Sequence, residues 1–233
     1  QAFWQFPACR LPVGAMARCC GCSGVCLHAA AGPLAAQACA SDDERQAIGD
    51  LSAKLQDMVS SASTLAVAAV ADKVGLFRIL AQAKQPLTAE AIARIGGYHP
   101  RYVTEVCSCL ACAGLLVSGG EKFELSAAQT RLLADPKFPL AMGGWLQLVP
   151  TLFNAVPGVS AAMSTPSPTT GVPFSRFSDW GFAEAMDRLN GPGIEAAYVR
   201  KWLPALPGGV AELQRGIVVA DLGCGSGRLA LTL

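Results

Sequence analysis

The chain has 233 residues, of which 52% are hydrophobic and 15% are charged, so it can bury a sizeable core. Its net charge of +1 provides no electrostatic argument for binding nucleic acid or an acidic surface. Glycines and Pro33 interrupt the apolar part of the N-terminal region, so we predict no transmembrane helix there and no membrane partner.

Residues 1–40 differ in composition from the rest of the chain. They contain no Asp or Glu, and they hold six of the ten cysteines: Cys9, Cys19, Cys20, Cys22, Cys26 and Cys39. If Met16 is the true start, the segment resembles a signal or transit peptide and the protein is organellar or secretory. If the segment is instead a poorly ordered tail, or is not natively protein, the protein is cytoplasmic.

A zinc site is a further alternative for this N-terminal segment. Its ligands would be Cys19, Cys22, Cys26 and His28. Their spacing fits no two-pair zinc template, so we predict no metal site.

A long helix is predicted after Ser41. Ser41 and Glu44 form a capping-box pattern, in which Ser41 is the N-cap. Apolar residues then recur at helical spacing: Leu51, Leu55, Met58, Val59 and Leu65. This face has two interpretations, a core helix or a dimer interface.

Three short helices and a β-hairpin are predicted next. The helices cover 74–84, 89–95 and 100–113, with Thr88 and His99 as candidate caps. The strands cover 115–117 and 123–125, and Ser126 caps a following helix with Gln129. Helix, helix, helix and hairpin is the order of a winged helix.

The charge of this winged helix argues against a DNA-reading role. Between Gln85 and Ser126 the chain has three basic and four acidic residues, which gives a net charge of −1. A DNA-binding face needs several cations to neutralise phosphates. Three cysteines in this region are predicted to pack as small apolar side chains: Cys107, Cys109 and Cys112.

The segment 136–208 is predicted to be a helical linker. Its helices cover 140–149, interrupted by Pro150, then 182–189 and 194–203. A short helix over 210–214 is predicted after this segment. Within the linker, 171–177 is predicted as an aromatic loop. Phe174, Arg176 and Phe177 are candidates for lining a substrate pocket, because such pockets are mostly apolar with a few polar groups. The alternative is an ordinary loop with aromatic anchors.

The last seventeen residues contain the most specific pattern. A β-branched run, Ile217–Val219, leads through Asp221 into a glycine triplet at 223, 225 and 227, and an apolar run follows. This order predicts strand, glycine turn and helix. Glycine permits positive φ and close approach of backbone N–H groups to a ligand. The spacing differs from both the dinucleotide fingerprint and the phosphate-binding P-loop.

The stretch Asp221-Leu222-Gly223-Cys224-Gly225-Ser226-Gly227 resembles motif I of class I S-adenosylmethionine-dependent methyltransferases. In that family the glycine turn lies under the methionine and ribose parts of the cofactor, and the acidic residue orients the turn. The resemblance implies S-adenosyl-L-methionine as cofactor. It assigns cofactor binding to Asp221, Gly223, Cys224, Gly225, Ser226 and Gly227, with Cys224 and Ser226 contributing backbone only. Many small-molecule methyltransferases also carry an N-terminal winged helix, which the run 74–125 resembles.

The expected fold is mainly α, with a winged helix, a helical linker and the first strand-turn-helix of a truncated Rossmann-like domain. The expected divisions are 1–40, 41–135, 136–208 and 209–233. The acceptor implied is a small molecule, and 41–135 is a candidate homodimer interface. No catalytic base is assigned, and we expect these residues alone to be an inactive fragment. The alternative function is a winged-helix DNA-binding or ligand-sensing regulator with a degenerate methyltransferase domain.

Overall fold

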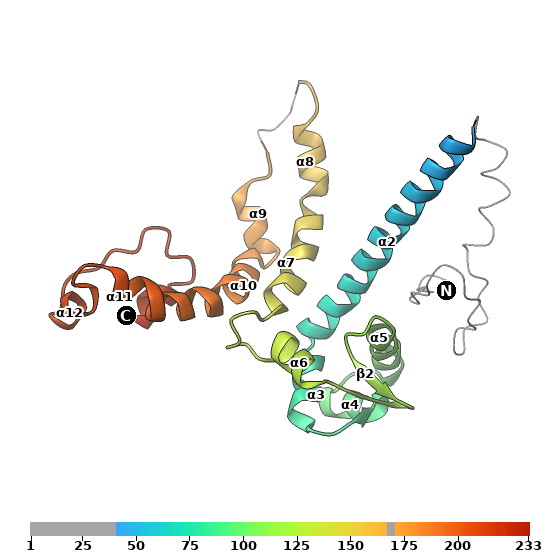
Figure 1. The fold of residues 1–233 in the computed structure, drawn as a ribbon, viewed down its shortest axis with the longest axis horizontal. Helices are drawn as coiled ribbons and strands as arrows, with labels where there is room; N and C mark the ends of the chain where they lie inside the picture. The colour runs from blue at the N-terminus through green and yellow to red at the C-terminus, as the bar shows by residue number, and fades with distance from the viewer. Residues whose placement is uncertain (1–40, 167–170) are drawn as a thin grey trace.

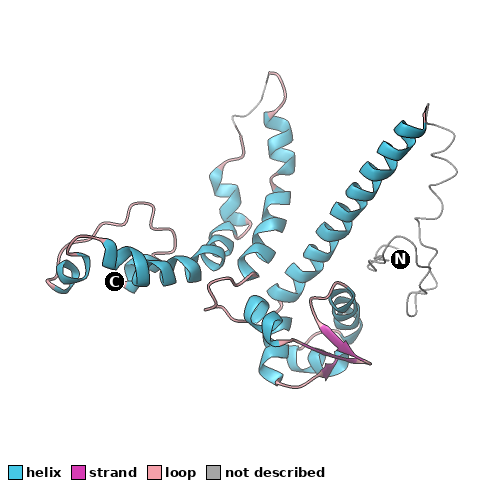
Figure 2. Ribbon diagram, viewed as in Figure 1, coloured by secondary structure: helices cyan, strands magenta, loops and turns pink. Residues whose placement is uncertain are grey.

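The computed structural model describes residues 41–166 and 171–233, and these are mainly helical (Figure 2). The targeting and zinc predictions for 1–40 lie outside the described residues. Helix α2, Asp42–Lys73, begins at Ser41, whose hydroxyl accepts a hydrogen bond from the Glu44 amide at 3.1 Å. The predicted N-cap is therefore confirmed. The helix ends before Gly75, whose φ of 77° is the left-handed conformation that favours glycine.

Three short helices and a small sheet follow α2. The helices are α3 (Leu76–Ala83), α4 (Ala89–Gly96) and α5 (Pro100–Cys112). The strands are β1 (Leu87–Thr88), β2 (Val117–Gly119) and β3 (Lys122–Glu124), in the antiparallel order β1-β3-β2. The Thr88 hydroxyl caps α4 and the His99 ring caps α5, as predicted.

Strand β2 lies later in the chain than predicted, because Leu115 and Leu116 precede it. Leu116 is buried, whereas all three residues of β2 are exposed. Leu116 belongs to the hydrophobic core and Leu115 packs against it. In β3, Phe123 pairs with both Leu87 and Ser118 and also points into the core.

The main core lies among these helices and the sheet. Its most completely buried large side chains are Phe77, Leu76, Ile92, Leu110 and Cys107. Ala68 and Ala71 from α2 and Leu146 from a later helix join the same cluster. The C-terminal part of α2 is therefore anchored in the core. Its N-terminal part projects beyond the body of the molecule (Figure 1).

The rest of the chain is a series of helices. They are α6 (Ala127–Gln129), η2 (Thr130–Ala134), α7 (Gly143–Asn154), α8 (Val156–Ala162), α9 (Phe174–Asp179), α10 (Phe182–Ala197), η3 (Tyr198–Trp202), α11 (Leu203–Ala205), α12 (Gly209–Gln214) and α13 (Arg228–Thr232). Ser126 and Gln129 form a complete capping box at α6. None of the described helices is long and apolar enough to cross a membrane.

Several predicted boundaries in this region are wrong. Helix α7 continues through Pro150, and the two helices predicted over 182–203 are one continuous helical run that contains Pro192. The second half of the predicted aromatic loop is helix α9. Proline removes one backbone donor, but packing against neighbouring helices holds the flanking turns in line.

Helix α7 packs against α10 on one side and α2 on the other. Close approach is possible because Gly144 faces the backbone of Leu189 on α10. A Cβ at position 144 would overlap the Leu189 amide. Because α10 also contacts α13, it lies between α7 and the C-terminal glycine motif.

The strand predicted over Ile217–Val219 is not formed. These residues are exposed coil, and Val218 is 97% exposed. A strand needs backbone partners, and the described part of the chain places no other strand beside this segment. The local β-branched sequence is therefore not sufficient to produce a strand here.

Candidate cofactor-binding turn

The glycine motif forms an open turn ahead of α13. Gly223, Gly225 and Gly227 have φ values of 78°, 57° and 76°, a region that side-chain-bearing residues rarely adopt. The amide of Gly227 donates to the carbonyl of Cys224 at 2.9 Å and closes the turn. A Cβ built at any of the three glycines meets no atom within 4 Å. The turn therefore has room for a ligand at its backbone.

The acidic residue of the motif is solvent-exposed. The carboxylate of Asp221 makes no hydrogen bond or ion pair with the described residues. Cys224 is also exposed and carries a free thiol. An unpaired carboxylate beside an open turn is available to accept hydrogen bonds from a ligand.

One side of the turn is fixed to helix α10 by Asp187. The Ser226 hydroxyl donates to this carboxylate, and the Arg228 guanidinium donates to it through Nε at 3.0 Å and Nη2 at 2.5 Å. Hydrogen bonding from Arg228, supported by Ser226, lowers the pKa of Asp187 below its ordinary value, against the opposing effect of burial. The Ser226 side chain therefore helps to attach the turn to α10.

Glycine also permits the Arg228 contact. The guanidinium crosses α10 at Gly191, where a Cβ would overlap it, and its Nη1 reaches Glu195 at 3.3 Å. Neither Asp187 nor Arg228 was identified from the sequence. They are separated by 41 residues, and no local motif connects them.

A second polar cluster joins α10 to the N-terminal domain. Arg188 binds Asp72 of α2 in a bidentate pair, with both N–O distances 2.8 Å. Gln147 of α7 donates to the same carboxylate at 2.7 Å. The Asp72 side chain is only 5% exposed, so its charge is compensated by three directed donors.

The three predicted substrate-lining residues lie on α9. Phe174 and Phe177 form an aromatic cluster with Trp180 and Phe182, with ring centroids between 5.3 and 6.4 Å apart in the contacting pairs. Phe174 is 73% exposed and Arg176 is also exposed. None of the three predicted residues lines either of the two cavities described next.

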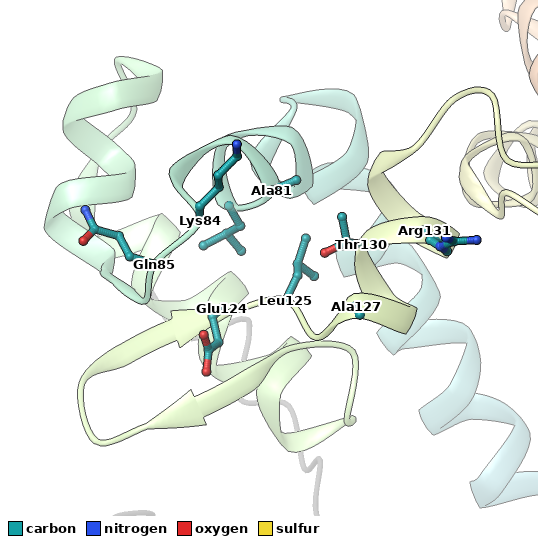
Figure 3. Close-up of a pocket in the computed structure, with 9 residues that line it drawn as sticks. Ala81, Lys84, Gln85, Glu124, Leu125, Ala127, Thr130 and Arg131 are labelled. Carbon is teal, nitrogen blue, oxygen red and sulfur yellow. The ribbon is translucent and has the colours of Figure 1, made fainter.

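A cavity of about 380 Å³ lies between α3, β3 and α6 (Figure 3). The side chain of Leu125 points into it, while the charged ends of Lys84 and Arg131 point away from it. A second cavity of about 380 Å³ lies beside α10 and is lined in part by Asp72, Arg188 and Arg228. Those three side chains are already engaged with protein partners.

The described residues contain no cluster of His, Cys, Asp and Glu that could hold a metal ion. Cys107 is buried as predicted, and burial raises the pKa of its thiol to about 12. Cys109 is half-buried and Cys112 is exposed, so the apolar packing expected of all three cysteines applies fully to Cys107 alone. The Cys107 thiol is therefore not a candidate nucleophile.

The solved structures that resemble this chain include two O-methyltransferases. The mitomycin 7-O-methyltransferase MmcR has 21% identity and a TM-score of 0.49, over 66% of this chain and 48% of that one. An O-methyltransferase family protein from Burkholderia thailandensis has 19% identity and a TM-score of 0.42, over 66% and 46%. The chain thus spans about half the length of either structure.

No family model matches the chain, and no curated protein matches it. Both structural TM-scores lie below 0.5, so the function of this protein has to be inferred from its own residues.

Proposed function

We propose that the protein is an S-adenosylmethionine-dependent methyltransferase that acts on a small-molecule acceptor. The observation that carries this proposal is the glycine motif, Asp221–Gly227. All three of its glycines have positive φ, and their Cβ positions face open space. That arrangement fits a cofactor laid across the backbone of the turn. The proposed architecture is a winged helix, a helical linker and a Rossmann-like cofactor-binding segment.

The cofactor, when bound, supplies a methyl group on a sulfonium centre and needs no activation of the leaving group by the protein. The chain's own residues bind and orient it. The Gly223–Gly227 backbone fits beneath the cofactor, and the exposed Asp221 carboxylate accepts hydrogen bonds from it. The main catalytic contribution of such a site is to hold the methyl donor and the methyl acceptor in line.

The test is calorimetric titration of S-adenosylhomocysteine into the protein. We expect binding in the parent protein. Gly225→Val should abolish this binding, because valine is strained at φ 57° and its side chain fills the open face. Absence of binding by the parent protein would overturn the proposal.

We further propose that the N-terminal domain pairs two copies of the chain. Leu51, Leu55, Met58 and Val59 share one face of α2 and are each more than half exposed. Their charge-free stripe lies on the part of the helix that projects from the body (Figure 1). An apolar stripe of this kind on a projecting helix is typical of an interface between helices.

A further inference from the structure

We propose that Asp187 is a positioning residue for the glycine turn. This inference rests on the proposed function, since the turn is the proposed cofactor site. Asp187 is placed on α10 and touches no glycine of the motif. It acts through Ser226 and Arg228, the two residues that flank Gly227.

The contacts favour positioning over incidental surface pairing. Asp187 accepts three hydrogen bonds, one from a hydroxyl and two from one guanidinium, and its side chain is 24% exposed. An exposed single ion pair contributes little, whereas a bidentate charge-assisted pair fixes geometry as well as adding energy. No strand within residues 41–166 and 171–233 lies beside the turn, and this carboxylate is its principal side-chain attachment to α10.

Gly191 supports the same inference independently. It lies one helical turn after Asp187, and its missing side chain leaves the space that the Arg228 guanidinium occupies. Glycine inside a helix is unfavourable relative to alanine. The substitution Gly191→Ala should therefore favour the helix itself while displacing Arg228 from Asp187. The two variants disturb one contact by different means.

The first experiment needs no cofactor. Trypsin cleaves after Arg228 only when that residue is released from its partners, so the initial rate of this cleavage, followed by mass spectrometry, reports release of the turn. We expect Asp187→Asn and Gly191→Ala each to raise the rate about tenfold, which corresponds to loss of roughly one charge-assisted hydrogen bond. Cleavage after the exposed Arg215 serves as the internal reference.

The matched control is Asp179→Asn, which removes the same charge from an exposed position on α9. It should leave cleavage after Arg228 unchanged. Equal rates for the parent and Asp187→Asn would overturn the inference. So would an equal rise in Asp179→Asn, because the effect would then be one of general charge.

The second experiment separates this inference from the proposed function. Asp187→Asn should weaken S-adenosylhomocysteine binding about tenfold without changing the thermal unfolding midpoint of the protein, and Asp187→Glu should restore part of the affinity. Unchanged affinity in Asp187→Asn would overturn the positioning role. If the parent protein does not bind at all, the proposed function fails, while the cleavage experiment still decides whether Asp187 holds the turn.

Discussion

Cys107 illustrates how burial controls chemistry at a single residue. Its thiol lies in the core beside Leu110, and its pKa is raised to about 12. At pH 8 only about one molecule in ten thousand would carry the thiolate, which is the reactive form. We predict that iodoacetamide modifies Cys112 and Cys224 in the native protein and spares Cys107, as measured by peptide mass spectrometry. Modification of Cys107 at the rate of Cys112 would contradict its buried position.

Asp187 gives a pH prediction at the same scale. Its pKa is lowered below 3.8, so the ionised form of Asp187 is favoured more in the folded protein than in the unfolded chain. The stabilisation is therefore fully present above pH 3.8 and is lost as the pH falls through the lower, folded-state pKa. The side-chain carboxyl resonance of Asp187 should titrate below pH 3.8 in the parent. In Arg228→Gln it should move back toward 3.8, and an identical titration in both proteins would refute the pairing.

At the scale of elements, the packing of α7 on α10 depends on Gly144. A methyl group at this position would meet the Leu189 backbone, which cannot rotate away as a side chain can. We predict that Gly144→Ala destabilises the fold by about 1–3 kcal/mol, measured as a lower midpoint of urea unfolding.

The matched control is Gly49→Ala on α2, where a Cβ would meet no atom within 4 Å. This change should raise helix stability by up to about 1 kcal/mol, since alanine is the better helix former. If both substitutions shift the urea midpoint in the same direction, the close approach of α7 and α10 does not limit stability.

The elements that the sequence predicted well are those set by local contacts. The N-caps at Ser41, Thr88 and Ser126 each depend on a partner three residues away, so their signal lies in the sequence itself. The strand predicted at 217–219 failed because strands depend on distant partners. Pro150 did not end its helix, because the surrounding helices hold both halves.

Parts of the candidate site could likewise be predicted from the sequence, and parts of it could not. Positive φ at Gly223, Gly225 and Gly227 could be anticipated, because the glycine spacing alone indicates a turn. The attachment of the turn to Asp187 could not, since it depends on how α10 lies against a segment 41 residues later. Gly191 gave no local signal either, because its purpose is to leave space for a residue from another helix.

At the scale of the whole molecule, the projecting part of α2 leads to a prediction about assembly. We expect the chain to sediment as a dimer, and Leu55→Glu to shift it toward monomer, because a charge would enter an apolar interface between copies. The control is Ala53→Glu, on the opposite face of the same exposed helix, which should leave the sedimentation coefficient unchanged. A parent protein that remains monomeric at tens of micromolar would contradict the pairing proposal.

Helix α10 connects the two halves of the molecule through consecutive residues. Asp187 binds residues of the glycine turn and Arg188 binds Asp72 of α2, so the two side chains point away from the helix in different directions. Inserting one residue into a helix rotates everything beyond it by about 100°. In evolutionary terms, α10 should therefore accept many substitutions but no insertion or deletion between Asp187 and Gly191, which carry both contacts and the space for Arg228.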